Sequence, residues 1–311
     1  MLGHYLTDYP GSQYGADKSA VANKIAENNA VLCLLNGSDD GSNPVANKAN
    51  CQPLYQNEIQ TEGGEWYMNQ NYQHRDAAFE EILHFVHDYG IGVDGRGGNP
   101  GALPAYQAEI RTAQKNGSAK NLWGIGEENK AWLKELAREN SLSQEYLAAV
   151  IDSYYGLWGA YTESATNGMW GMYVGKTRED TKTDDPMGYD VVGMFFHPYL
   201  TYNARIEPTF SGTFSLRFDA SKPYTHHSQY LKDITLLGNN DNNVIVNNLD
   251  NTITGNAGTN TVIFAGKSDE YKVITENGKI TVQDTVKNRD GKNVLTNIEK
   301  LQFSDKVVKI K

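Results

Sequence analysis

The residues best suited to chemistry lie in one short stretch, where acidic residues and histidines are separated by helical intervals. Glu80, His84 and His87 recur at positions i, i+4 and i+7, so a helix would present their side chains on one face. A carboxylate and two imidazoles on one face can bind one divalent metal ion. The alternative is that these side chains are simply hydrated on the outer face of an amphipathic helix. We favour a metal site because the surrounding stretch is unusually apolar for a hydrated face.

The same stretch resembles the H-E-x-x-H helix of zincin metallopeptidases, with the first histidine replaced to give E-E-x-x-H. The resemblance implies that Glu80 and His84 bind zinc and that Glu81 is the general base. It leaves His87 as an extra ligand or as a partner of a ligand. The carboxylate at the first ligand position departs from the family pattern and puts zinc affinity and hydrolysis in question.

The resemblance also implies a third ligand and a donor for the reaction's oxyanion. Gluzincin-type enzymes take their third ligand from a glutamate on a later helix, and Glu163, next to aromatic residues, is our candidate. Tyr202, or Tyr199 in the same stretch, would donate a hydrogen bond to the oxyanion. The predicted function is hydrolysis of a protein or peptide by metal-activated water. Two alternatives stay open: an inactive extracellular or surface binding protein, and a glycan-active enzyme with paired carboxylates.

Hydrophobic periodicity predicts the elements that position these residues. The most strongly patterned helix covers residues 75–89, with its apolar residues on the face opposite the acidic and histidine side chains. Further helices are expected at 16–29, 103–115, 127–139 and 143–156. A buried strand is expected at 31–35, and a hairpin of strands 54–60 and 65–70 around Gly63-Gly64.

The two cysteines, Cys33 and Cys51, allow one disulfide bond. Cys33 lies in the apolar run Val31–Leu35, where a buried, reduced cysteine is the more common outcome. We therefore favour an unbridged Cys33, and no Cys-x-x-Cys metal pattern is present.

A nine-residue repeat runs through residues 237–263. Three asparagines, Asn242, Asn251 and Asn260, share one column of the repeat, and an aliphatic column follows two residues later at Val244, Ile253 and Val262. Asp233 and Thr235 fall in the same columns one step earlier, as a less regular leading turn. Such a period predicts short strands that wind into a parallel β-roll or β-helix with the aliphatic column inside.

These columns resemble the G-G-x-G-x-D-x-U-x repeat of hemolysin-type calcium-binding proteins, whose aspartates bind calcium between coils. The aspartate column is asparagine here, which should weaken calcium binding because an amide offers only a neutral oxygen. Asp233, Asp241 and Asp250 are therefore only weak calcium candidates. The favoured alternative is an asparagine ladder that satisfies turn hydrogen bonds without metal.

The carboxyl-terminal sequence L-T-N-I-E-K-L-Q-F resembles the unit that closes such repeats in proteins exported by bacterial type I secretion. The resemblance covers about residues 230–311 and implies a secreted bacterial protein without an amino-terminal signal peptide.

The sequence as a whole predicts an α+β protein of two domains. Residues 1–205 would form a mostly helical, zincin-like domain, and residues 206–311 an all-β domain with the degenerate repeats at about 233–263. The net charge of −10 argues against a nucleic-acid partner. No run of about 18 apolar residues predicts a membrane span.

Overall fold

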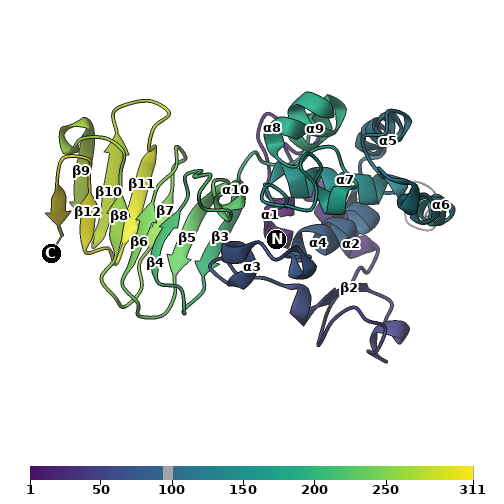
Figure 1. Cartoon of the computed structure of the whole chain (residues 1–311), viewed down its shortest axis with the longest axis horizontal. Helices are drawn as coiled ribbons and strands as arrows, with labels where there is room; N and C mark the ends of the chain where they lie inside the picture. The colour runs from purple at the N-terminus through teal and green to yellow at the C-terminus, as the bar shows by residue number, and fades with distance from the viewer. Residues whose placement is uncertain (94–100, 311) are drawn as a thin grey trace. The chain divides into compact units, whose positions relative to one another are not determined.

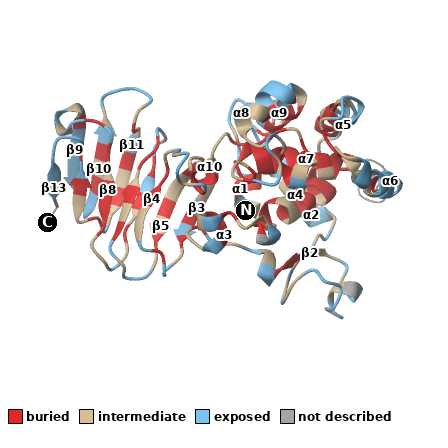
Figure 2. Cartoon of the chain, viewed as in Figure 1, coloured by how far each residue is buried: buried red, intermediate tan, exposed pale blue. Residues whose placement is uncertain are grey.

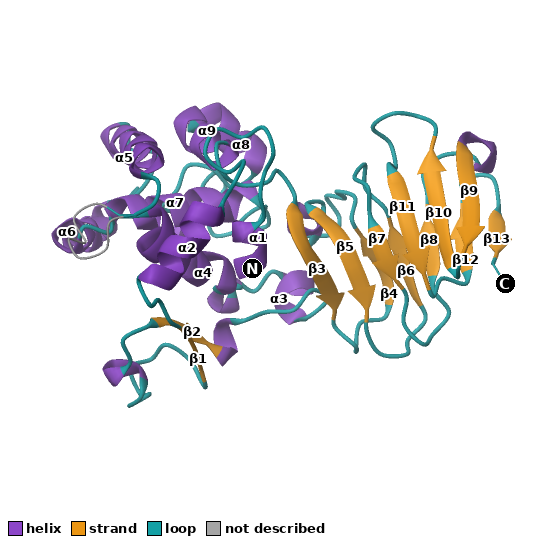
Figure 3. Cartoon of the chain, turned by 180° about the vertical axis from the view of Figure 1, so that it is seen from behind, coloured by secondary structure: helices purple, strands orange, loops and turns teal. Residues whose placement is uncertain are grey.

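The computed structural model describes residues 1–93 and 101–310 and contains both helices and sheets, so the chain is of mixed α+β class (Figure 3). The chain divides into two compact units (Figure 1). The first unit consists of Met1–Gln60 and Tyr72–Pro198. The second unit consists of Thr61–Asn71 and Tyr199–Lys311. The second unit takes in residues 61–71 and resumes at Tyr199, just before β3 (Leu200–Ile206), whereas the predicted boundary lay at residue 205. A bulge between Leu200 and Asn203 interrupts the regular pairing of β3 and obscures its sequence pattern.

The first unit is a cluster of helices around α7 (Leu142–Tyr154). Figure 2 shows α7 as mostly buried. From Ser143 to Tyr154 every residue of α7 is buried except Glu145. The helices in contact with α7 are α4 (Ala78–Val86), α5 (Pro104–Ala119), α6 (Lys130–Glu139), α8 (Arg178–Asp184) and α9 (Pro186–Gly193). Two further helices, α1 (Leu2–Leu6) and α2 (Ser19–Glu27), contact each other, and α1 also contacts α4.

All five predicted helices are confirmed, with boundaries that differ by a few residues. Shorter helical turns connect them: Ala46–Lys48, Gln56–Glu58, Tyr72–His74, Glu127–Asn129 and Met169–Gly171, with a π-helical turn at His87–Ile91. No helix within the described residues combines the length and apolar character that crossing a bilayer requires.

The predicted hairpin at residues 54–70 is wrong. Strand β1 (Leu32–Leu35) pairs in parallel with β2 (Gln52–Tyr55), and residues Glu65–Asn69 form helix α3 of the second unit. Trp66 and Tyr67 are both buried, which adjacent residues of a strand with one buried face cannot be. Gly63-Gly64 therefore precedes a helix rather than forming a hairpin turn.

The expectation of an unbridged Cys33 is also wrong, because Cys33 and Cys51 form a disulfide bond. The parallel register of β1 and β2 places Cys33 opposite Pro53, so Cys51 lies just before the paired segment. Their Cα atoms are 5.9 Å apart, within the usual range for a disulfide.

The second unit contains two sheets of six and five strands, ordered β3-β5-β7-β11-β10-β9 and β13-β12-β8-β6-β4. The remaining bounds are β4 Gly212–Ser215, β5 Leu231–Leu236, β6 Asn242–Ile245, β7 Thr252–Thr254, β8 Thr261–Ile263, β9 Tyr271–Glu276, β10 Lys279–Asp284, β11 Lys292–Thr296, β12 Lys300–Gln302 and β13 Val307–Lys309; the short helices are α10 (Thr225–Ser228) and Ser268–Glu270. Consecutive strands from β3 to β8 alternate between the sheets, and neighbours of this series within each sheet are parallel. The chain thus completes one circuit for every two strands.

The nine-residue repeat corresponds to half of such a circuit. Val244 lies opposite Val262 in one sheet, whereas Ile253 lies opposite Ile234 in the other, and the three residues of the aliphatic column are fully buried. The predicted leading turn is displaced by one residue, since Ile234 rather than Thr235 continues the column and Asp233 faces Thr252. The circuit from β5 to β7 is one residue longer than two repeats, which the sequence pattern did not show.

Candidate metal site

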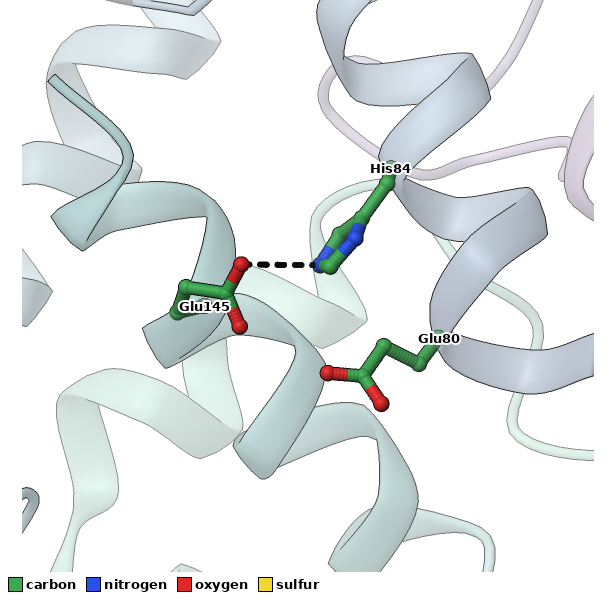
Figure 4. Close-up of side chains that lie close together, drawn as sticks. All are labelled: Glu80, His84 and Glu145. Carbon is green, nitrogen blue, oxygen red and sulfur yellow. Dashed lines mark ion pairs between the residues drawn. The ribbon is translucent and has the colours of Figure 1, made fainter. Parts of the chain in front are cut away.

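The packing of helix α4 in the core decides where its acidic and histidine side chains point. Phe79, Leu83 and Val86 are fully buried and fix the rotation of the helix. Glu80 and His84, one turn apart, then project together toward α7 (Figure 4). After Val86 the helix widens into the π-helical turn and ends before Gly92, whose φ of 106° strongly favours glycine.

Glu80, His84 and Glu145 of α7 form the metal-site group. One potential ligand atom from each lies within 4.8 Å of the other two. Nε2 of His84 lies 3.6 Å from Oε1 of Glu145 and has no hydrogen-bond partner although it is buried. Figure 4 marks this pair with a dashed line. An imidazole nitrogen and two carboxylates of this kind make a donor set for a divalent cation.

Glu81 lies beside this group. Its Oε2 atom is 3.7 Å from Nδ1 of His84 and accepts a hydrogen bond of 2.6 Å from Nε2 of Gln52. Burial lowers the pKa of His84, but the hydrogen bond that His84 donates to Glu81 and the charges of Glu145, Glu81 and Asp88 outweigh it, so the pKa of His84 is raised overall. Burial also raises the pKa of Glu145, against the opposing effect of His84.

Arg75 neutralises part of this negative charge. Its guanidinium forms one ion pair with Glu80 and another with Asp152 of α7, where Nη1 lies 3.2 Å from Oδ2. Burial raises the pKa of Asp152, while the charge of Arg75 acts in the opposite direction. Arg75 therefore links the two helices that supply the metal-site group.

Three further predicted site residues, besides Glu81, do not belong to the group. Nε2 of His87 is 2.6 Å from Oε1 of Gln107 on α5, and the His87 side chain is completely buried there. Glu163 is exposed in the segment after α7, where it accepts a hydrogen bond of 3.4 Å from Tyr161. Tyr202 belongs to the second unit and donates a hydrogen bond of 2.9 Å to Glu62, whose pKa is raised by burial.

Glu145 is the site residue that sequence reasoning missed, although the helix that carries it was predicted. It directly precedes the apolar run Tyr146–Ile151, in a helix whose residues from Ser143 to Tyr154 are otherwise all buried. A carboxylate in such a helix requires a partner, and this requirement was the available signal.

The weak calcium candidates do not converge. Oδ1 of Asp233 accepts the backbone N–H of Thr252, Asp241 that of Thr259 and Asp250 that of Lys292, at 2.8, 2.7 and 2.8 Å. Each carboxylate thus links neighbouring strands of one sheet. The column asparagines are buried, and the Nδ2 groups of Asn242, Asn251 and Asn260 all donate to backbone carbonyls.

An unusual turn lies beside Arg75. Met169, Trp170 and Gly171 have φ values of 41°, 53° and 85°, and the left-handed region costs a residue with a side chain roughly 1–2 kcal/mol. Reciprocal backbone hydrogen bonds between Gly168 and Tyr173 close this turn. The Trp170 ring lies 5.0 Å from the guanidinium carbon of Arg75 and edge-on to Trp158.

No protein-family model, curated protein or solved structure matches this chain. What the site can do is therefore inferred from its own geometry.

Proposed function

We propose that the first unit is a zinc-dependent peptidase whose ligands are Glu80, His84 and Glu145. The observation that carries the proposal is the convergence of these side chains from two helices, with potential ligand atoms within 4.8 Å of one another. Their order along the chain is that of a gluzincin-type site, with two ligands on one helix and a glutamate on a later one. Glu145 takes the role that the sequence suggested for Glu163.

The group suits zinc in both chemistry and spacing. Zinc binds imidazole nitrogen and carboxylate oxygen at about 2 Å in tetrahedral geometry, which places ligand atoms about 3.3 Å apart. Rotations of these side chains would have to bring the ligand atoms closer than the observed spacing of up to 4.8 Å. Glu80 has two oxygens, so it can pair with Arg75 through one and bind metal through the other. A bound zinc ion would polarise the scissile carbonyl and lower the pKa of water.

Glu81 is the proposed general base. Its side chain is about 25% exposed, so water reaches it, and Gln52 holds one of its oxygens in place. The carboxylate would accept the proton of the attacking water and return it to the leaving amine. Gln52 is a positioning residue in this proposal, because it touches Glu81 rather than the substrate.

The second unit would serve export, folding or attachment outside the cell. The alternation of parallel-paired strands between two sheets supports a β-roll of the hemolysin type, with buried asparagines in the aspartate column. Because Asp233, Asp241 and Asp250 each bind a backbone N–H, calcium has no part in this proposal.

A second candidate function is a non-catalytic extracellular binding protein on the same scaffold. The ion pair between Arg75 and Glu80 favours it, because the pair already satisfies the first proposed ligand and competes with a metal ion.

Metal analysis and peptide cleavage separate the two functions. Chelator-treated, zinc-reloaded protein is expected to hold about one zinc ion per chain, and His84→Ala to hold far less with the fold retained. Glu163→Ala, outside the group, is the matched control. Glu81→Gln should keep zinc but fail to cleave a quenched fluorescent peptide library. Zinc well under one ion per chain would overturn the peptidase proposal, and stoichiometric zinc without cleavage would favour the binding protein.

A further inference from the structure

Trp170 is exposed where a tryptophan of purely structural role would be covered. Trp170 is 45% exposed, whereas Trp66, Trp123 and Trp158 are buried. It also stands in the left-handed region between two other residues of positive φ. Strained backbone of this kind persists only where the surrounding structure enforces it, and it is concentrated at functional sites.

Contacts around the turn hold its backbone in this conformation and connect it to the helix that carries part of the metal site. Beyond the Gly168–Tyr173 hydrogen bonds, Oγ of Ser153 on α7 donates to the carbonyl of Gly175 at 2.7 Å. Ser153 directly follows Asp152, which binds Arg75. The turn is therefore fixed to the helix that also carries Glu145.

The contacts of the indole specify where it stands. It lies over the guanidinium of Arg75, which in turn pairs with Glu80 of the metal-site group. Behind it, Trp158 is stacked on Tyr72 with ring centroids 4.8 Å apart, so the indole has a rigid aromatic support. An exposed apolar surface is thus held one side chain away from Glu80.

We propose that Trp170 lines a subsite for a large apolar side chain of the peptide substrate, next to the metal site. The inference rests on the proposed peptidase function. An acidic side chain is not the expected occupant, because the charge of Arg75 is already shared by Glu80 and Asp152. Burial of one large apolar side chain against such a surface strengthens binding by about tenfold or more.

The test compares two quenched fluorescent peptides, one of alanines only and one with phenylalanine at the centre. Wild-type protein is expected to cleave the phenylalanine peptide with about tenfold higher kcat/KM. Trp170→Ala should lose this preference and cleave the two peptides with about equal kcat/KM, and Trp170→Phe should keep most of the preference. Phe218→Ala is the matched control, because Phe218 is a similarly exposed aromatic residue, at 47%, in the second unit.

The outcomes distinguish the subsite from the peptidase activity. If Trp170→Ala cleaves the peptides with the wild-type preference, the subsite is overturned and the peptidase stands. If wild-type protein cleaves neither, binding of the same labelled peptides is measured by fluorescence anisotropy. A tenfold preference that depends on Trp170 would then support the subsite without the peptidase. Equal binding of both peptides by wild-type protein would overturn the subsite, whether or not Trp170→Ala folds.

Discussion

His84 of α4 and Glu145 of α7 face each other with Nε2 and Oε1 3.6 Å apart. A buried imidazole nitrogen without a hydrogen-bond partner beside a carboxylate is the arrangement that a cation would complete. The helices themselves do not require this contact, because apolar residues of both already pack in the core.

Glu145→Gln is expected to weaken zinc binding at least about tenfold, because an amide replaces a charged ligand at nearly constant shape. Competition against a chromophoric chelator measures the change. Glu163→Gln removes an exposed carboxylate of the same unit that lies outside the group, and it should leave the affinity unchanged. Equal loss in both variants would point to the general charge of the unit rather than to the metal-site group.

Arg75→Met should destabilise the first unit by about 3–5 kcal/mol, because it leaves Glu80 and Asp152 without their shared cation. Urea unfolding followed by tryptophan fluorescence gives the value. Arg138→Met, an exposed change on α6, should stay within about 0.5 kcal/mol. Adding Asp152→Asn to Arg75→Met should recover part of the loss, and a strictly additive double variant would contradict the pairing.

Replacement of Cys33 and Cys51 by serine should lower the stability of the first unit by about 3 kcal/mol, the loop-closure term for a separation of this size. The bridge is important here because β1 buries little, with Leu34 71% exposed. Denaturation of oxidised wild-type protein and the double serine variant measures the effect. Unchanged stability of the variant would show that β1 and β2 hold without the bridge.

We predict from the burial of Lys18 that the folded protein becomes more stable at alkaline pH. Burial lowers the pKa of Lys18 from 10.5 to about 8, although its ammonium donates to the carbonyl of Tyr5. Between pH 8 and 10.5 the folded state therefore binds fewer protons than the unfolded state. The free-energy cost of burying the charged ammonium is complete below pH 8 and disappears toward pH 10.5. The stability of wild-type protein relative to Lys18→Met should rise between pH 8 and 9.5 by up to about 1.4 kcal/mol per pH unit. A flat difference across this range would contradict the shift.

Asn251→Asp should destabilise the second unit by about 2–4 kcal/mol, because a buried carboxylate would face oxygen atoms. The amide nitrogen of Asn251 now donates to the carbonyl of Lys232 and to Oδ1 of Asn247, at 2.8 and 2.9 Å. Thermal unfolding measures the loss, with the exposed change Asn248→Asp as control. Recovery of stability on addition of calcium would mean that the column can still form a calcium site.

Local pattern predicted the helices and the repeat because each depends on residues close in sequence. The face of α4 that carries Glu80 and His84 follows from its 3.6-residue period. That Glu145 rather than Glu163 lies opposite depends on the packing of α4 against α7, which no periodicity encodes. The disulfide was missed for the same reason, since it depends on the parallel register of β1 and β2. The one-residue shift at Ile234 reflects a longer circuit that the spacing of the later repeats did not reveal.

Residues 61–71 interrupt the first unit in sequence but belong to the second, where Glu62 accepts a hydrogen bond from Tyr202. The ribosome therefore releases this segment long before the later strands of its own unit, because more than a hundred residues of the first unit, Tyr72–Pro198, are synthesised in between. A fragment that begins at residue 199 would not be an independent second unit, because it would lack residues 61–71. The second unit therefore cannot be completed until the whole first unit has been synthesised.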